Sequence, residues 1–143
     1  MRAGEVPELA DYATVEKEKK YGSENSRIDL LLTDPERPPC YVEIKNVHMR
    51  LEPGVASFPD AVTERGLKHL RELTAEVAKG NRAVMLYIIQ RGDCRTFRPA
   101  HEVDPAYAAG LKAAADAGVE ILAYSCHVSP QQITLADRLD ISL

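Results

Sequence analysis

The first fifty residues contain three short segments in which apolar and polar positions alternate, as side chains do across a β-strand. This pattern predicts strands at Ala13 to Lys20, Ser26 to Leu32 and Cys40 to Val47. Between the last two, Thr33 to Pro39 contains three prolines, and because proline has no amide donor we expect a connecting loop there. Strands joined by such short loops pair most easily in antiparallel order, so the pattern predicts a three-stranded meander.

The pattern changes to a helical period after His48 to Pro59, a stretch that shows neither period and is predicted to be a surface loop. From Ala61 to Lys79 the apolar residues share one helical face: Leu67, Leu70, Leu73 and Val77. The polar residues gather on the opposite face, which we expect to meet water: Arg65, Lys68, His69, Glu72 and Glu76. Gly80-Asn81 is a good stop for this helix.

The second half of the chain predicts a strand, a helix and another strand. Arg82 to Gln90 is nearly all apolar, which fits a central strand buried on both faces. Asp104-Pro105 is a helix cap, and the helix that it begins ends at Gly118. Val119 to Tyr124 is the next strand, parallel to the first through a right-handed crossover. The predicted fold is therefore α/β, a mixed sheet flanked by helices, with no assignment for Ile133 to Leu143.

Length and composition favour one compact domain over residues 1–143, since 45% of the residues are hydrophobic. No apolar run approaches the roughly 18 residues that span a bilayer, and the first residues lack the layout of a secretory signal. Cys40, Cys94 and Cys126 are far apart and contain no CxxC pair, as expected for free thiols in a reducing compartment. We therefore expect a cytoplasmic protein without a membrane partner.

The net charge of −4 and the pI near 5.6 argue against a chain coated in basic residues, the usual footprint of a nonspecific nucleic-acid binder. A polyanionic partner such as DNA would have to be held by a local basic patch. Arg27, His48 and Arg50, together with Lys45, are the residues expected to form such a phosphate patch.

Two predicted strands place charged residues among core positions. In the strand from Cys40, one face carries Tyr41, Glu43 and Lys45 and the other carries Val42 and Ile44. In the strand before it, Ile28, Leu30 and Leu32 form a core face, which leaves Asp29 on the reverse. Neighbouring strands lie about 4.8 Å apart, so Asp29 and Glu43 are expected to reach a shared ion.

These residue types suit the hydrolysis of a phosphodiester, which needs an activated water and relief of negative charge. Mg²⁺ or Mn²⁺ held by Asp29 and Glu43 would supply both. Lys45 beside the ion would orient the water or stabilise the transition state. The pattern therefore predicts a metal-dependent nuclease site, although acid-x-Lys also fits a solvated sheet face on which Lys45 forms a surface salt bridge.

Three further residues are accessory candidates for this site. Glu18, on the strand that precedes Asp29, would add a third carboxylate, although an ordinary solvated strand fits it as well. Arg65 and Lys68, near the start of the long helix, would add positive charge, although their face is also the one expected to meet water.

Three separated motifs resemble the sugar fermentation stimulation protein A family: Tyr21 to Asp29 (YGSENSRID), Cys40 to Val47 (CYVEIKNV) and Phe58 to Leu73 (FPDAVTERGLKHLREL). The resemblance continues through Gly118 to Tyr124 to the end of the chain. It implies a restriction-endonuclease-like core of the PD-(D/E)xK type, with Asp29, Glu43 and Lys45 in the metal and catalytic positions. It also implies DNA binding tied to the regulation of sugar metabolism.

The chain departs from this family in one respect, because it lacks the N-terminal domain, similar to an oligonucleotide-binding barrel, that family chains carry. An excised or naturally shortened nuclease domain is the expectation, and the missing part would have supplied much of the nucleic-acid contact surface. Three functions stay open at this point: a metal-dependent nuclease acting on DNA, a noncatalytic DNA-binding regulator, and an interaction domain whose charged pair is structural.

Overall fold

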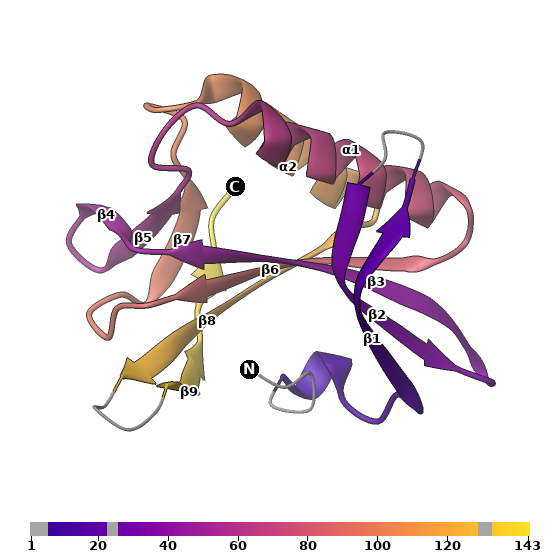
Figure 1. The fold of residues 1–143 in the computed structure, drawn as a ribbon. Coiled ribbons are helices and arrows are strands. Elements are labelled where there is room, and N and C mark those ends of the chain that lie inside the picture. Colours follow the sequence, from indigo (N-terminus) through magenta and orange to yellow (C-terminus); the bar gives the residue numbers. More distant parts are fainter. Residues whose placement is uncertain (1–5, 23–25, 129–132) are drawn as a thin grey trace.

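A computed structural model describes residues 6–22, 26–128 and 133–143 as two mixed β-sheets and two α-helices (Figure 1). The main sheet has the strand order β1 (Thr14–Tyr21), β2 (Ser26–Asp34), β3 (Arg37–Val47), β6 (Arg82–Ile89), β8 (Glu120–Val128), β9 (Ile133–Arg138). The second sheet has the order β10 (Asp140–Ile141), β7 (Thr96–Pro99), β5 (Val55–Phe58), β4 (Met49–Glu52). Helices α1 (Glu64–Ala78) and α2 (Pro105–Asp116) pack on each other over one face of the main sheet (Figure 1). The predicted mixed sheet flanked by helices is confirmed.

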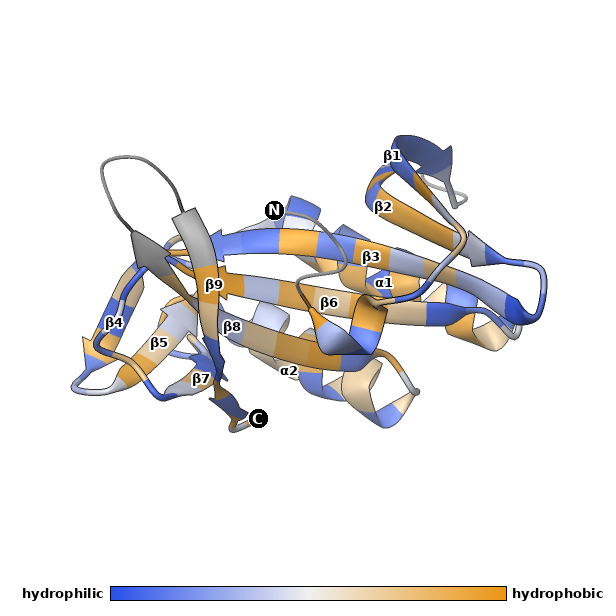
Figure 2. Cartoon of the chain, turned by 90° about the horizontal axis from the view of Figure 1, so that it is seen from below, coloured by the Kyte–Doolittle hydropathy of each residue, from blue (hydrophilic) through white to orange (hydrophobic). Residues whose placement is uncertain are grey.

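The topology of the main sheet follows from its sequence pattern. β1, β2 and β3 form the predicted antiparallel meander, whereas β3, β6 and β8 are parallel, as their helical connections require. Every residue of β6 after Arg82 is buried, which confirms its central place. β1 lies at an edge and is largely hydrophilic, as expected for a strand with one free side (Figure 2).

Apolar side chains form two clusters, one on each face of the main sheet. The cluster beneath the helices includes Leu70, Leu73 and Tyr87, all essentially inaccessible to solvent. The other cluster lies against the short 3₁₀ helix η2 (Pro7–Leu9), which contributes the buried Leu9. Within the described ranges, no helix combines the length and apolar character that crossing a membrane requires.

The two helices begin at a shared polar junction. Asp104 caps α2 by accepting a hydrogen bond from the Tyr107 amide (3.0 Å), and its second oxygen accepts one from the Thr63 amide (2.9 Å). Thr63 in turn caps α1 by accepting from the Gly66 amide (2.9 Å). The predicted stops at Gly80 and Gly118 are confirmed, since both glycines have a positive φ.

Three expectations from the pattern are wrong. β2 and β3 extend into the predicted loop Thr33 to Pro39 and leave only a tight turn, because β3 pairs with β6 only from Cys40 onward and its prolines therefore need no amide donor there. The predicted loop His48 to Pro59 contains the β4–β5 hairpin around Gly54. Its four-residue strands are too short to show a period.

The third concerns the polar face of α1, which does not lie wholly in water. His69, Glu72 and Glu76 are 2–4% exposed and face the β1–β3 part of the main sheet. Glu72 accepts a hydrogen bond from the Ser26 hydroxyl (3.3 Å), and Glu76 accepts one from the Asn81 side chain (2.9 Å). α1 therefore buries two stripes, one apolar and one polar, since each polar group on the buried stripe has a partner on another element or at the end of the helix.

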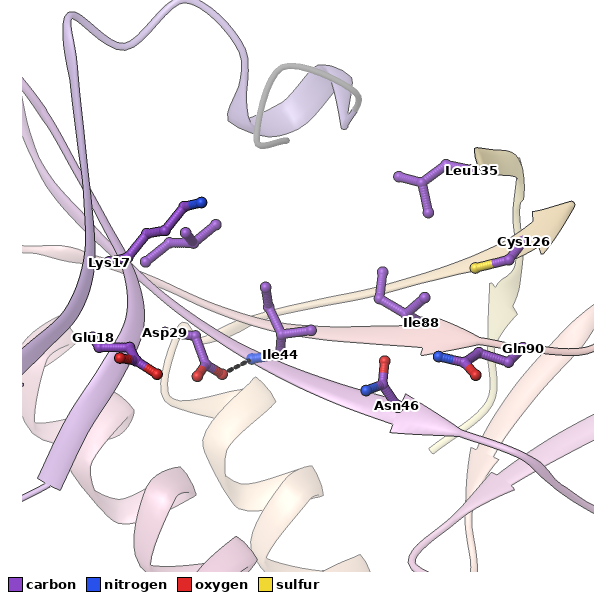
Figure 3. Close-up of a pocket in the computed structure, with 10 residues that line it drawn as sticks. Lys17, Glu18, Asp29, Ile44, Asn46, Ile88, Gln90, Cys126 and Leu135 are labelled. Atoms are coloured by element: carbon purple, nitrogen blue, oxygen red, sulfur yellow. Dashed lines mark hydrogen bonds between the residues drawn. The ribbon is translucent and has the colours of Figure 1, made fainter. Parts of the chain in front are cut away.

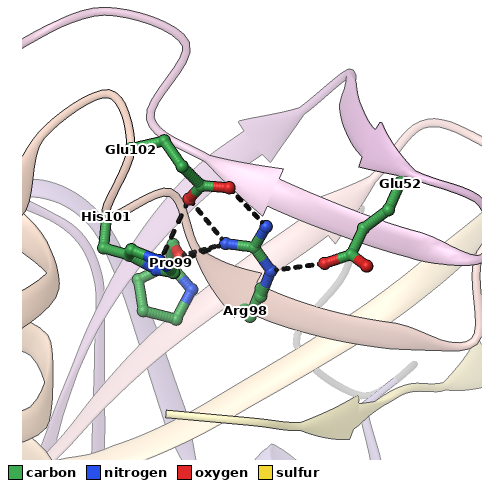
Figure 4. Close-up of polar contacts among 5 residues, drawn as sticks. All are labelled: Glu52, Arg98, Pro99, His101 and Glu102. Carbon is green, nitrogen blue, oxygen red and sulfur yellow. Dashed lines mark hydrogen bonds and ion pairs between the residues drawn. The ribbon is translucent and has the colours of Figure 1, made fainter.

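The second sheet is tied together by ion pairs at its surface. The Arg98 guanidinium on β7 donates two hydrogen bonds to Glu102 (2.8 and 2.6 Å) and one to Glu52 on β4 (3.0 Å) (Figure 4). A guanidinium held in this bidentate way is fixed in orientation. Arg98 is thereby committed to these partners rather than available for a ligand.

Candidate active site

The candidate site lies where β2 and β3 separate. The two strands pair from the turn as far as Leu30 and Val42, and no further pairs follow on β3 toward Val47. Just beyond the last pair, the Asp29 carboxylate accepts a hydrogen bond from the Ile44 amide (2.7 Å). A side chain therefore takes the place of a backbone partner on β3, and it holds Asp29 in the opening between the strands.

The core face predicted for β2 is wrong at one position. Leu30 and Leu32 pack in the cluster on the η2 face, as expected, but Ile28 belongs to the cluster beneath the helices. The alternation changes phase at Asp29, where the ladder with β1 omits Glu18 and Glu18 takes a positive φ of 53°. The irregularity that brings Asp29 into the opening is thus a local break in strand geometry.

Glu43 and Lys45 lie on the face of β3 toward α1, while Val42 and Ile44 pack on the opposite face, as alternation predicts. Glu43 is only 4% exposed, and its Oε1 atom is 3.6 Å from the Lys45 ammonium. The solvated surface pair considered as an alternative is excluded by this burial, because both side chains lie beneath α1.

His69 on α1 completes the cluster and was missed by sequence reasoning. Its Nδ1 atom is 2.9 Å from the Lys45 ammonium and 3.2 Å from Glu43 Oε1. The helical period predicts that His69 faces water, because it lies opposite the apolar face of α1. The spacing of His69, Glu72 and Glu76 over three and four residues was the available signal, since it describes a second stripe of the same helix.

The electrostatics of the cluster follow from burial. Burial, and next the negative charge of Asp29, raises the pKa of Glu43 to about 8. Burial, and next the Lys45 ammonium, lowers the pKa of His69 to about 4, so this imidazole is neutral at pH 7. Burial also lowers the pKa of Lys45, against the opposing effect of Glu43. The carboxylates of Asp29 and Glu43 therefore repel each other, and the Lys45 ammonium offsets this repulsion only in part.

The residues present fit a divalent cation bound by two carboxylates. Glu43 Oε2 is buried and has no hydrogen-bond partner in the described part of the chain, and Asp29 lies beside Glu43. A buried carboxylate oxygen without a partner is costly, and an oxygen-preferring cation is the partner that such an atom suits. Among the described residues, no group of three or more His, Cys, Asp and Glu side chains is arranged to hold a metal. A hard cation at Asp29 and Glu43 would therefore keep several waters, as Mg²⁺ does.

The accessory candidates lie around this cluster. Glu18 and Asp29 line the same cleft, with both carboxylates directed into it (Figure 3). The positive charges of Arg65 and Lys68 are close enough to contribute to the lowered pKa of His69. Arg65 is exposed and Lys68 is partly exposed, so both side chains reach solvent at the edge of the site.

The residues of the predicted phosphate patch differ in exposure and in their ion-pair partners. Arg27 and His48 are exposed, on β2 and just after β3. Arg50 instead forms an ion pair with Asp93 (3.1 Å). Glu43 thus contacts Lys45 and lies beside Asp29, whereas Arg50 of the predicted patch is paired with a residue outside it.

Fold and site define a class of protein: a mixed α/β chain in which separating strands hold two carboxylates and a lysine under a helix. The family model for the sugar fermentation stimulation protein RE domain matches residues 1–132, and the chain belongs to this family. Curated relatives named sugar fermentation stimulation protein homolog are 58% identical over 140 residues in Rhodospirillum centenum and 52% identical over 143 residues in Maricaulis maris.

These relatives are longer than the chain, which covers 60% of each of them while they match 98% and 100% of it. A solved structure of Pyrococcus furiosus SfsA in complex with Ca²⁺ is 31% identical, with a TM-score of 0.87. It matches 96% of this chain, which in turn covers 58% of that protein. The resemblance inferred from the motifs is thereby confirmed.

Proposed function

We propose that the chain is a divalent-metal-dependent nuclease domain that hydrolyses phosphodiester bonds in DNA, with a restriction-endonuclease-like core of the PD-(D/E)xK type. One observation carries the proposal: Glu43 lies beside the Asp29 carboxylate, its Oε1 atom is 3.6 Å from the Lys45 ammonium, and its buried Oε2 atom has no hydrogen-bond partner among the described residues. Carboxylates held this way oppose a phosphate backbone unless a cation lies between them. Three free thiols agree with a cytoplasmic location.

Asp29 and Glu43 would hold Mg²⁺ or Mn²⁺ at this site. When bound, such a cation lowers the pKa of a coordinated water and neutralises charge on the phosphoryl oxygens. A solved relative, Pyrococcus furiosus SfsA, is in complex with Ca²⁺, which prefers oxygen ligands as Mg²⁺ does.

The remaining chemistry belongs to the chain itself. The Ile44 amide fixes the Asp29 carboxylate by a 2.7 Å hydrogen bond, so the two acids keep their separation. Lys45 donates to the attacking water or to a phosphoryl oxygen, and the neutral His69 accepts from Lys45 and holds its ammonium in place. His69 is therefore a positioning residue in this scheme, acting through Lys45.

The proposal is tested by cleavage of single- and double-stranded DNA in Mg²⁺ or Mn²⁺ with the wild type, Asp29→Asn and Lys45→Met. Asparagine still accepts the Ile44 hydrogen bond and methionine keeps the length of lysine, so both variants are expected to fold. We expect each to lose at least about a hundredfold in rate, the usual cost of removing a stabilising group from an active site. His69→Gln should reduce the rate less.

Matched controls are Asp116→Asn and Lys112→Met, exposed residues of α2 outside the cluster, which should leave the rate unchanged. Cleavage that persists in both Asp29→Asn and Lys45→Met would show that these two residues do not carry the activity and would contradict the proposed site. Wild type without cleavage in either metal would end the proposal.

A second candidate is a noncatalytic DNA-binding regulator of sugar metabolism, favoured by the sugar fermentation stimulation names of the relatives. It predicts that removing the acids improves DNA binding, since uncompensated carboxylates repel phosphates. Tighter binding by Asp29→Asn, together with no cleavage by the wild type, would favour it.

A further inference from the structure

A cleft of about 540 Å³ lies next to the candidate active site and extends away from it along β3 (Figure 3). Asp29 and Glu18 line one end, and Asn46 and Gln90 line the other. Glu43 and Lys45 do not line it, because they lie on the α1 side of β3. Asp29, in the gap between β2 and β3, is therefore the residue that joins the cleft to the site.

The far end of the cleft presents two primary amides. Asn46 follows Ile44 by two residues on β3. Gln90 follows the neighbouring parallel strand β6, and its backbone N–H donates a hydrogen bond to the Val47 carbonyl (2.8 Å). Figure 3 shows both side-chain amides directed into the same space. Neither has a hydrogen-bond partner among the described residues, so each offers a donor and an acceptor to a ligand.

The wall above these amides is apolar. Ile44 and Ile88 line the cleft between its two polar ends, and Leu135 and Cys126 line it on the side of the amides (Figure 3). A volume of several hundred cubic ångström with an apolar wall and a few convergent polar groups is typical of a small-ligand site. The ligand expected from these walls has a flat apolar body with both donors and acceptors on its edge.

We propose that this cleft binds an unpaired nucleobase of the nucleic-acid strand whose phosphodiester lies at Asp29. Primary amides are the side chains that pair with base edges through a donor and an acceptor at once. A base inside a duplex cannot enter such a cleft, so the proposal makes single-stranded or extruded nucleotides the preferred substrate. This inference rests on the proposed function for the position of the phosphodiester.

At the other end of the cleft, Glu18 and Asp29 repel a phosphate unless a cation lies between them, and the Lys17 ammonium on the same strand as Glu18 adds one positive charge there. The amide end carries no charge and lies two residues farther along β3, at about 3.3 Å per residue. A base at the amide end and a cation-bound phosphate at Asp29 suit these two ends. The opposite orientation would place the base among charged side chains and the phosphate at the uncharged amides, with no cation-binding carboxylate beside it.

The test measures binding of a short fluorescent single-stranded DNA oligonucleotide in Ca²⁺, and of the same oligonucleotide with an abasic nucleotide at each position in turn. The proteins are the wild type, the double variant Asn46→Ala/Gln90→Ala, and the control Lys112→Ala on the exposed face of α2. We expect the double variant to bind the intact oligonucleotide about tenfold more weakly than the wild type does. When the abasic nucleotide is at the position whose base would occupy the cleft, the wild type and the double variant should bind the oligonucleotide equally.

Equal weakening of intact and abasic oligonucleotides by the double variant would overturn the inference, as would no weakening or no binding by the wild type. A second measurement does not depend on the variants folding: the side-chain amide signals of Asn46 and Gln90 in a ¹⁵N spectrum should shift when a deoxynucleoside monophosphate is added. Unshifted signals would also overturn it.

The two proposals fail separately. Cleavage without base-dependent binding would remove the base site and leave the nuclease. Base-dependent binding without cleavage in Mg²⁺ or Mn²⁺ would remove the nuclease and leave the base site.

Discussion

Burial favours the protonated form of Glu43, whereas the proposed cation would bind the ionised form. In the unfolded chain its pKa is near 4.5, whereas burial and the charge of Asp29 raise it to about 8 in the folded chain. Between these values the folded chain holds a proton on Glu43 that the unfolded chain has lost. The contribution to stability is therefore complete below pH 4.5 and is lost as the pH rises through 8.

The variant Glu43→Gln stays uncharged at every pH, so we expect it to exceed the wild type in free energy of unfolding at pH 8.5 by about 2 kcal/mol or more. At pH 4.5 the two should be nearly equal. Chemical denaturation at both pH values measures this, with the exposed Glu36→Gln as control. Parallel curves for wild type and Glu43→Gln would show that Glu43 is ionised in the folded chain. Added Mg²⁺ should stabilise the wild type at pH 8.5 and leave the variant unaffected.

At the scale of elements, the hydrophobicity pattern predicts the position of α1 but not which of its faces are buried. The positions of β1, β2, β3, β6, α1, α2 and β8 were predictable because each has a clear period or a capping signal. The buried face of His69, Glu72 and Glu76 was not, because whether a polar stripe meets water depends on which strands lie beneath the helix. The β4–β5 hairpin was missed for another reason, because its strands have four residues each and show no period, although the two strands are close in sequence.

The site was predictable for a similar reason and to a similar extent. Alternation along β3 placed Glu43 and Lys45 on one face, and adjacency of β2 and β3 placed Asp29 near them. The break in strand geometry at Asp29 was not in the pattern, since it arises where Glu18 and Asp29 drop out of the ladder. The contact of His69 with Lys45 and Glu43 was not predictable, because the helical period places His69 on the face of α1 expected to meet water.

The fit between α1 and the β1–β2 hairpin gives a testable prediction at Gly22. This glycine has φ 74°, and a Cβ there would lie 1.4 Å from Oε2 of the buried Glu72. Gly54 has nearly the same φ, 77°, but nothing within 4 Å of a Cβ. We expect Gly54→Ala to cost about 1 kcal/mol for backbone strain and Gly22→Ala about 2 kcal/mol more, since Glu72 must move from its partner.

Urea denaturation of both variants measures the difference, which isolates the packing of Glu72 because the strain at the two glycines is matched. Equal losses for Gly22→Ala and Gly54→Ala would show that Glu72 relaxes freely, and the buried polar stripe would then be less constrained than its burial suggests.

For the molecule as a whole, net charge limits how the proposed nucleic-acid substrate could be bound. The net charge is −4, and several arginines are already paired, Arg50 and Arg91 with Asp93 and Arg98 with Glu52 and Glu102. Besides Lys45, the cationic side chains near the site among the described residues include Lys17, Arg27, Arg65 and Lys68. Binding should therefore depend on local contacts and on the bound cation more than on a broad electrostatic field.

We expect the logarithm of the association constant for single-stranded DNA to fall with the logarithm of salt concentration with a slope of about −2, equivalent to about three phosphate contacts. Fluorescence anisotropy over a range of KCl concentrations at fixed Ca²⁺ measures it, and Arg65→Ala should reduce the slope by roughly 0.7. A slope near −7 would show an extensive basic surface and contradict this picture.

The Asp29 carboxylate has two roles, because it accepts the hydrogen bond of the Ile44 amide and would also bind the proposed cation. Where β2 turns away from β3, an amide would be left without an acceptor, and the aspartate supplies it. Loss of this side chain would thus weaken the fold as well as any reaction, so a chain that had given up hydrolysis would still have reason to keep it. An aspartate at this position is evidence of an intact strand junction, and Glu43 and Lys45 are the better indicators of activity.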